Sequence, residues 1–285
     1  MVEIILEKNN EDYKRKYSTI LEKYEVELQL FLINLKDEII IDNNNIRGGI
    51  YIDNELSLLF INAFPYNLLL YSFNNTKESC EYLARYLIAN EIKFKGINGD
   101  RLECDSFIKE YNCLALKEFI PNLEMNILKL TEIIKPEVVI RNSKITPYIA
   151  TMDDYEFIVK CLIKFYYEIN KMIVHEKDIM DKVINNITNN RYYILKDANN
   201  KRVSMININR ILKHGQCISE VYTVEEERNR GYSTIIMYHV CLKILKTSSY
   251  VSLFVDQNNP ISNKVYASIG FKRVCSQYDY KMKYE

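Results

Sequence analysis

The sequence predicts two domains that both mix helices and strands, an α+β or mixed α/β fold class. Its length of 285 residues exceeds the roughly 100–200 residues of a usual single domain. Apolar residues make up 48% of the chain, enough for two cores, and helical and strand periodicities occur in both halves. Two prolines and no helical period mark the segment around residues 133–147. We therefore expect domains of residues 1–135 and 136–285.

Composition and charge exclude several classes of function. Lys plus Arg and Asp plus Glu each total 38, and no long basic run occurs, so we expect a small substrate and no nucleic-acid partner. No run approaches the roughly 18 apolar residues of a membrane span, and MVEIILEKNN lacks the pattern of a leader. We expect a cytoplasmic protein with no membrane partner. Seven scattered cysteines without CxxC spacing favour reduced, mostly buried thiols and no metal site.

The first half has the pattern of an α+β domain. Apolar residues at three- and four-residue steps predict one long amphipathic helix over residues 10–36. The elements expected after it are strands at 48–53, 55–64 and 67–73, a helix at 78–92, a strand at 93–99 and a helix at 99–111. No catalytic signature occurs in this half. The pairs Gly48, Gly49 and Gly96, Gly99 lack the spacing of a phosphate loop, so we interpret them as turn residues.

The second half predicts a mixed sheet between helices. Its expected order is helix, helix, three strands, helix, strand, helix, strand. The first five of these elements fall at residues 152–169, 175–187, 191–197, 201–210 and 217–223. The turn DANN between the first two strands indicates a hairpin. Sheets of this kind bind ligands where an antiparallel meander changes to strand, helix, strand.

A loop and helix start at that change of pattern predict an anion site. An acidic stretch, Glu225 to Glu227, precedes Arg228, Asn229, Arg230, Gly231, Tyr232, Ser233 and Thr234, which open an apolar helix. The first amides of a helix have no internal partners and lie at the positive end of its dipole, so a diphosphate can dock there. Gly231 allows close approach of the backbone, and Ser233 and Thr234 add hydroxyl donors.

Two motifs in this order resemble the GNAT superfamily of N-acyltransferases. Arg228 and Gly231 match the first and fourth positions of its coenzyme A signature, [Q/R]-x-x-G-x-[G/A], whereas the sixth position departs and is Ser233. About 30 residues later, an Asn-rich turn leads to a Tyr and then Gly-Phe; these residues are Asn259, Asn263, Tyr266, Gly270 and Phe271. The resemblance covers residues 190–285 and extends more faintly to 147. The whole chain is similar to a subgroup that carries a degenerate GNAT-like domain in front.

The resemblance implies a fold, a co-substrate and roles. The fold is the GNAT fold, a central, mostly antiparallel mixed sheet flanked by helices, and the co-substrate is acetyl-coenzyme A without a metal. The backbone of Val221, Tyr222 and Thr223 would pair with the pantetheine arm, beside a bulge that splays this strand from its neighbour. One of those amides would stabilise the oxyanion. Tyr266 would give a proton to the departing thiolate; the alternative is a core tyrosine.

A carboxylate on the central strand, near the expected separation of the strands, suggests the remaining catalytic group. Along CISEVYT, Glu220 and Tyr222 fall on one face and Val221 and Thr223 on the other. We choose Glu220 as general base, acting through water; the alternative is a solvated or salt-bridged carboxylate. Cys217 and Cys241 are expected to be buried rather than nucleophilic, because direct transfer needs no acyl-enzyme intermediate.

The first hypothesis for function is direct acetyl transfer from acetyl-coenzyme A to a small amine. The first domain would shape the acceptor site or form a homodimer. Two alternatives stay open: a coenzyme A-binding sensor or scaffold without transfer activity, and an N-acyltransferase that uses a longer acyl donor. No motif identifies the acceptor.

Overall fold

The computed structural model describes residues 1–36 and 43–283 and divides into two compact units. Unit 1 comprises Met1–Ile127, Asp256–Asn258 and Val274–Glu285, and unit 2 comprises Leu128–Val255 and Asn259–Arg273. These units differ from the expected domains. Residues 128–135 belong to unit 2 instead of the first domain, and most of the C-terminal strand belongs to unit 1 instead of the second domain. The strand lies in unit 1 because it pairs with a strand of that unit.

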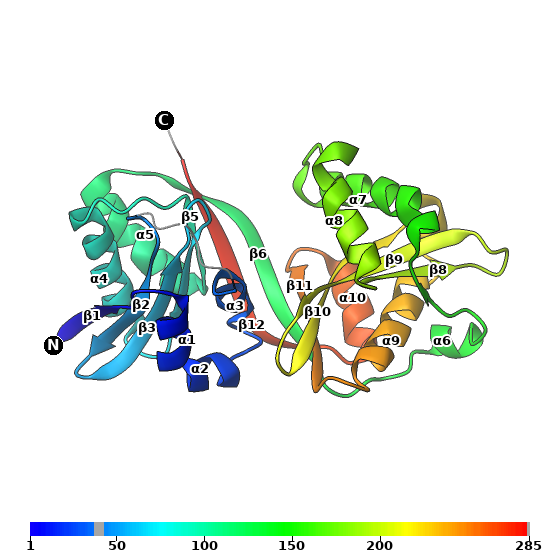
Figure 1. The fold of residues 1–285 in the computed structure, drawn as a ribbon, viewed down its shortest axis with the longest axis horizontal. Helices are drawn as coiled ribbons and strands as arrows, with labels where there is room; N and C mark the ends of the chain where they lie inside the picture. Colours follow the sequence, from blue (N-terminus) through cyan, green and yellow to red (C-terminus); the bar gives the residue numbers. More distant parts are fainter. Residues whose placement is uncertain (37–42, 284–285) are drawn as a thin grey trace. The chain divides into compact units, whose positions relative to one another are not determined.

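Unit 1 is a mixed sheet with helices (Figure 1). Its strand order is β1-β2-β3-β4-β5-β12-β6, and β4 and β5 are parallel. Along the chain the elements are β1 (Val2–Leu6), α1 (Asn10–Lys16), α2 (Ser18–Lys23), α3 (Gln29–Asn34), β2 (Ile46–Ile52), β3 (Glu55–Asn62), β4 (Leu68–Ser72), α4 (Thr76–Ala89), β5 (Gly96–Gly99), α5 (Arg101–Ala115), β6 (Phe119–Leu130) and β12 (Lys272–Met282).

The single helix expected over residues 10–36 is wrong. The segment forms three short helices, and the backbone leaves ideal helical angles at Tyr17, Tyr24 and Leu28. Its apolar side chains, including Tyr13 and Phe31, pack in one core cluster with residues of β3 and β4. The bends let successive turns follow the sheet, so tertiary packing overrides the helical period.

The four glycines interpreted as turn residues lie in strands instead. Gly48 is in β2 and Gly96 is in β5. A Cβ atom at Gly48 would come 2.1 Å from the carbonyl oxygen of Ile5, and one at Gly96 would come 2.2 Å from that of Tyr280. Close approach of a neighbouring strand therefore explains Gly48 and Gly96.

Unit 2 has the expected order of elements. Its strands run β11-β10-β9-β8-β7, and the β10–β11 pair is parallel. The elements are α6 (Glu137–Arg141), β7 (Tyr148–Ile149), a 3₁₀ turn (Met152–Asp154), α7 (Tyr155–Asn170), α8 (Glu176–Thr188), β8 (Tyr192–Lys196), β9 (Arg202–Ile211), β10 (Gly215–Thr223), a second 3₁₀ turn (Glu225–Glu227), α9 (Tyr232–Ile244), β11 (Tyr250–Asp256) and α10 (Pro260–Ile269). Two short elements are additional to that order, α6 in the segment expected to lack helix and β7 before α7, and the last expected strand, β12, lies mostly in unit 1.

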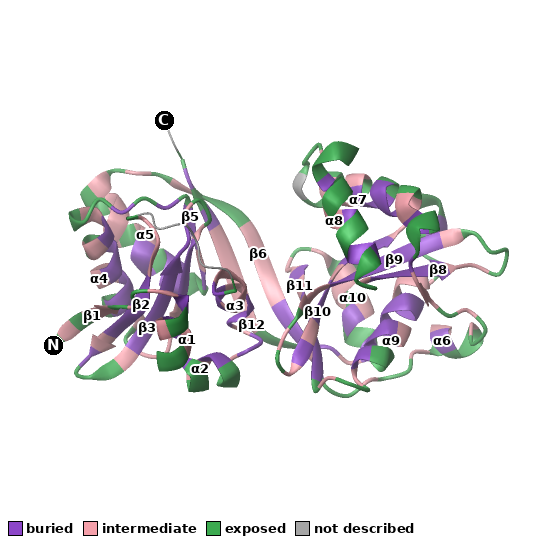
Figure 2. Cartoon of the chain, in the orientation of Figure 1, coloured by how far each residue is buried: buried purple, intermediate pink, exposed green. Residues whose placement is uncertain are grey.

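Helices cover both faces of the unit 2 sheet (Figure 1). One core cluster joins α7 and α8 to residues of β8, β9 and β10, and another joins α9 and α10 to the opposite face. Figure 2 shows these strands as largely buried between the two helical layers. The sheet is therefore accessible to a ligand only where neighbouring strands separate.

The two halves repeat one order of elements. The series β2, β3, β4, α4, β5, α5, β6 in the first half matches β8, β9, β10, α9, β11, α10, β12 in the second. In each series three antiparallel strands lead through a helix to a parallel strand. The expected mixed sheet flanked by helices is confirmed. No helix within residues 1–36 and 43–283 is long and apolar enough to cross a membrane.

The C-terminal strand should be essential to the stability of unit 1. Tyr280 of β12 is 8% exposed and belongs to the core cluster formed with β4, β5 and α5. We expect Tyr280→Ala to lower the free energy of unfolding by about 3–5 kcal/mol, because it leaves a large cavity. Tyr66→Ala is the control, since Tyr66 is 67% exposed. Urea unfolding followed by circular dichroism measures both; equal midpoints would contradict the assignment of β12 to this core.

Candidate functional site

A β-bulge interrupts β10 at Glu220. Ser219 is opposite Asn207 and Tyr222 is opposite Met205, so two residues of β10 face one residue of β9. Glu220 has φ +52°, a left-handed conformation that is unfavourable for a residue with a side chain. The bulge expected in this strand is therefore present and is centred on the residue chosen as general base.

The ladder between β10 and β11 ends just before the bulge. In the described chain, the parallel pairs run from Gly215 with Tyr250 to Ile218 with Leu253. Both strands continue beyond these pairs, to Thr223 and Asp256. The expected separation of the two strands is thus confirmed. It leaves a stretch of β10 that is not paired to β11 and with which an extended ligand can form hydrogen bonds.

From Glu220 to Tyr222 the side chains of β10 alternate between the two faces of the sheet. Tyr222 belongs to the core cluster of α7 and α8, and Val221 packs against the cluster of α9. The Glu220 carboxylate also faces α7 and α8, because it bonds to side chains of both helices. The predicted alternation of Glu220 and Tyr222 against Val221 is confirmed.

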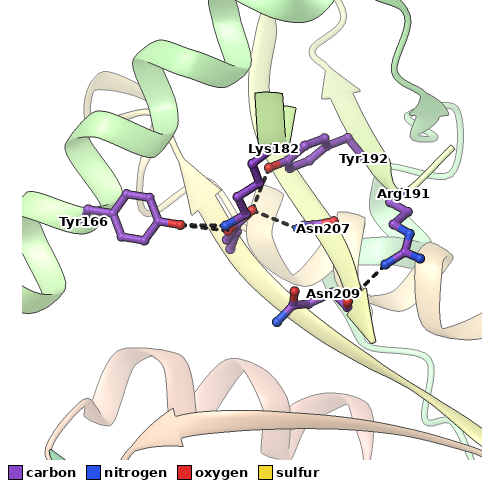
Figure 3. A network of polar contacts seen from close by, with 7 residues as sticks. Tyr166, Lys182, Arg191, Tyr192, Asn207 and Asn209 are labelled. Carbon is purple, nitrogen blue, oxygen red and sulfur yellow. Dashed lines mark hydrogen bonds and ion pairs between the residues drawn. The ribbon is translucent and has the colours of Figure 1, made fainter. Parts of the chain in front are cut away.

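Glu220 lies at the centre of a buried polar network, whose other members Tyr166, Lys182, Tyr192 and Asn207 are labelled in Figure 3. The carboxylate is only 6% exposed. Its Oε1 accepts from Tyr166 Oη at 3.1 Å and from Lys182 Nζ. Its Oε2 accepts from Tyr192 Oη at 2.7 Å and from Asn207 Nδ2 at 2.9 Å. Four donors from α7, α8, β8 and β9 therefore converge on one carboxylate.

The charges of this network are complementary. Burial opposes the charge of Lys182, but the Glu220 carboxylate outweighs it and raises the pKa of Lys182. Burial and the same carboxylate raise the pKa of Tyr166 and of Tyr192. The raised pKa values keep Lys182 charged and both phenols neutral at neutral pH, so the buried network contains a paired rather than an isolated cation.

The loop before α9 has the conformation of an anion-binding turn. Asn229 and Gly231 have φ +64° and +80°, and such positive φ values turn successive amides toward one side. Gly231 is the N-cap of α9 and provides no side-chain cap, and Ile235 N donates to Gly231 O. The earlier amides of α9, including those of Ser233 and Thr234, lie at the positive end of the helix dipole.

The reason for glycine at position 231 differs from the one expected. A Cβ atom there would lie 2.5 Å from Cγ2 of Val138, in helix α6. The space left by the missing side chain is filled by this valine, so close approach of a ligand does not explain the residue. Its positive φ gives a second reason.

Hydrogen bonds of Arg228 link the loop before α9 to the rest of unit 2. Its guanidinium donates twice to Glu168 at 2.8 Å and once to Thr223 O at 3.1 Å. Tyr222 Oη also donates to Glu168, at 3.0 Å. Arg228 uses one lone pair of the Thr223 carbonyl, so a ligand that bonds to this residue of β10 would lie against the guanidinium. Arg228 thus acts as a structural clamp between β10, α7 and the loop.

The buried carboxylate of the acidic stretch beside the loop is paired with two cations. Glu227 is 6% exposed and pairs with Lys201 and Arg230, each at 2.7 Å. Glu225 and Glu226 are exposed. A phosphate at the start of α9 would therefore not face a buried, uncompensated carboxylate.

The second motif forms the start of α10. Asn259 is the N-cap of this helix and accepts from Ser262 N at 3.0 Å, and Asn263 Nδ2 donates to Asn259 O at 2.7 Å. Tyr266 is 8% exposed and packs on Phe271, with ring centroids 5.9 Å apart. Burial raises the pKa of Tyr266 to about 12. The phenol is thus protonated at neutral pH, as a proton donor must be.

Two cysteine thiols near the site are buried. Cys217 is 1% exposed and Cys241 is 0% exposed. Burial raises the pKa of both thiols, which disfavours the nucleophilic thiolate. The burial and the raised pKa of these two thiols agree with the expectation of packed rather than reactive cysteines.

The sequence reasoning missed the partners of Glu220. Asn207 could have been noticed, because an amide interrupts the apolar run of a strand predicted to be buried. Tyr166 and Lys182 lie on helical faces with other Tyr and Lys residues around them. Only the three-dimensional fold brings them to β10.

The equivalent place in unit 1 is built differently. The parallel ladder of β4 and β5 ends at Leu69 and Asn98. Beyond it, the buried Glu103 carboxylate accepts from Ser72 N at 2.5 Å and from Asp100 N at 2.6 Å. A cavity of about 230 Å³ lies there, and Ser72 and Glu103 are among its lining residues. A side chain of unit 1 thus takes the amide at the end of β4.

Comparisons with known proteins agree on the fold. Residues 200–279 match the family model described as FR47-like protein. No curated protein sequence matches the chain. A GCN5-related N-acetyltransferase from Sphaerobacter thermophilus has 10% identity and a TM-score of 0.63, over 99% of this chain and 95% of that one. A GNAT-family acetyltransferase from Colwellia psychrerythraea has 12% identity and a TM-score of 0.56, over 99% and 100%.

A third solved structure is described as a tandem GNAT protein from the clavulanic acid biosynthesis pathway. It has 7% identity and a TM-score of 0.50, over 99% of this chain and 98% of that one. At these identities the likeness concerns the fold alone. It supports the expected tandem arrangement of the chain.

The loop before α9 should not tolerate a side chain at Gly231. We expect Gly231→Ala to lower the free energy of unfolding by about 1–3 kcal/mol, since it adds left-handed strain and a clash with Val138. Ser233→Ala, two residues away in α9, is the control and should change stability little. Thermal unfolding measures both. The double variant Gly231→Ala, Val138→Ala should recover part of the loss; no recovery would contradict the contact with Val138.

Proposed function

We propose that this chain, which has the fold of the GNAT superfamily, transfers an acetyl group from acetyl-coenzyme A to a small amine. Unit 2 is the catalytic unit in this proposal. The observation that carries it is the separation of β10 from β11 at the Glu220 bulge, next to the helix start at Gly231. An unpaired strand edge beside an anion-binding turn suits a ligand with an amide-containing arm and a diphosphate.

The residues present fit such a ligand. The backbone of Val221 and Tyr222 would pair with the arm, and one of these amides would face the oxygen on which charge develops. The amides at the start of α9 and the hydroxyl of Ser233 would hold the phosphates. Asn259 and Asn263 would lie beside the arm at the start of α10. When bound, the thioester supplies the activated acetyl group.

Tyr266 is the proposed proton donor to the leaving sulfur. Its pKa of about 12 lies above the ordinary thiol value near 8.5, so proton transfer to an exposed thiolate would be unfavourable. Exclusion of water would raise the thiol pKa as well and reduce this difference. Tyr266 therefore suits a closed site better than an open one.

Glu220 is the proposed acceptor of the amine proton. The carboxylate faces α7 and α8, so the amine would approach from that side of the sheet. An ionised carboxylate offers roughly four lone-pair sites, and all of them are used by the donors described above. One donor has to leave before Glu220 can act.

Calorimetry with acetyl-coenzyme A tests the proposal. We expect one molecule bound per chain, because Glu103 takes the Ser72 amide at the equivalent place of unit 1. Thiol release with a panel of amines then tests transfer. No binding at millimolar ligand contradicts the proposal, binding without release favours a sensor, and preference for a longer donor favours a different acyl group.

The role of Tyr266 gives a sharper prediction. We expect Tyr266→Phe to lower kcat about 100-fold or more, because it removes the proton donor, and to leave the Kd of the thioester nearly unchanged. Tyr238→Phe is the matched control, since Tyr238 is also 8% exposed and lies in the same core cluster. Stopped-assay turnover and calorimetry measure the two quantities. Equal turnover of the two variants would remove Tyr266 from the mechanism.

A further inference from the structure

The four donors to Glu220 are not equally fixed. Tyr192 and Asn207 come from strands and are fully buried. The side chain of Lys182 comes from α8 and is 39% exposed. A strand residue inside the core cannot move without disrupting packing, whereas a lysine at the edge of a site can swing into water. Lys182 is therefore the donor that can most readily leave the carboxylate.

The site occupied by the ammonium group of Lys182 would also suit the ammonium group of a ligand. It contacts a carboxylate oxygen and Tyr166 Oη, the latter at 2.7 Å. Its nitrogen also lies 5.4 Å from the centre of the Tyr166 ring, within range of a cation–π contact. A carboxylate, a phenol oxygen and an aromatic ring are the groups that bind a primary ammonium.

Two residues next to Glu220 carry unsatisfied oxygens: Asn207, which bonds to its carboxylate, and Ser219, which precedes it in the chain. Oδ1 of Asn207 and Oγ of Ser219 are buried and have no hydrogen-bond partner within the described chain. Asn207 is fully buried and its other amide atom already bonds to Glu220. Buried polar atoms without partners are costly, and a ligand that brings N–H donors would satisfy them.

Charge decides what can replace Lys182. If the lysine leaves alone, the buried Glu220 carboxylate is left without the counter-charge of Lys182, which is strongly unfavourable. A neutral or anionic ligand would leave that cost in place. A cationic ligand with N–H donors removes it.

From these contacts we propose that Lys182 marks the position of the acceptor ammonium. The acceptor is a primary alkylamine whose ammonium replaces Lys182 on Glu220 and Tyr166, and Lys182 closes the site when no acceptor is bound. The proposal rests on the proposed acetyl transfer for its chemistry. The binding step stands on the network alone (Figure 3).

The exchange also allows the proton transfers to balance. The bound ammonium gives one proton to Glu220, and the neutral nitrogen then bonds to the carbonyl carbon as the carbon–sulfur bond breaks. Sulfur receives a proton from Tyr266, and the second proton of the nitrogen returns to Tyr266 through water. Glu220 releases its proton to solvent when the product leaves and Lys182 returns.

The variant Lys182→Met tests the proposal, with Lys160→Met as matched control. Lys160 lies on α7 and pairs at the surface with Glu156, at 3.6 Å. We expect Lys182→Met to melt at a lower temperature than the unmodified chain and to be restabilised by n-butylamine. Tetramethylammonium, which has no N–H donor, should have no such effect. Lys160→Met should behave as the unmodified chain with both probes.

Kinetics provides the second readout. We expect Lys182→Met to lower the KM for n-butylamine about tenfold, the equivalent of about 1.4 kcal/mol, because the competing ammonium is gone. An unchanged or higher KM, or an absence of restabilisation by n-butylamine, would overturn the proposal. A higher KM confined to amino acids would assign Lys182 to an acceptor carboxylate instead.

Two further measurements keep the result interpretable. If Lys182→Met fails to fold, Lys182→Gln keeps a hydrogen-bond donor without the charge and is measured in the same way. Restabilisation by n-butylamine needs no coenzyme, so it tests the ammonium site even if acetyl-coenzyme A does not bind. Failure of the proposed function and failure of this inference are thereby distinguished.

Discussion

The structure of unit 2 depends on the carboxylate of Glu220, held by four donors at a bulge. A non-glycine residue in the left-handed region costs roughly 1–2 kcal/mol, and hydrogen bonds to a buried charged group offset a cost of this size. Because the carboxylate is fixed, the backbone of β10 turns at Glu220. The ladder to β11 then ends, and Val221 and Tyr222 face opposite helical layers. One buried interaction thus sets both the strand edge and the side from which an amine would approach.

The two units show how one topology can have different sites. Both place a parallel strand beside the last strand of an antiparallel meander, and both ladders end early. In unit 2 a bulge and a loop of positive φ residues follow. In unit 1 the buried Glu103 carboxylate accepts from Ser72 N, and burial raises its pKa. The shared sheet therefore fixes where a ligand can bind, whereas single side chains decide whether the strand edge is available.

The sequence predicted the elements whose signals are local. The strands at residues 191–223 and the turn between the first two follow from alternation and turn residues. The prediction of a single helix over residues 10–36 was wrong because the bends in this segment arise from packing on β3 and β4. The helix α6 was not predicted because its five residues follow a proline in a stretch without a helical period of apolar residues. The network around Glu220 joins residues 166, 182, 192, 207 and 220, and contacts at such separations have no signature in one sequence.

The signature glycine shows how a motif can be right for a different reason. Gly231 was expected to let a diphosphate approach, yet its positive φ and the Val138 side chain already require glycine. A glycine at a helix start is therefore weak support for a ligand when considered alone. The separation of β10 from β11 is stronger, because strands in a buried sheet lose hydrogen bonds by parting. The parting of the strands leaves backbone groups of β10 for a ligand, water or a side chain to satisfy, as Arg228 does at Thr223, and that requirement connects the bulge at Glu220 to function.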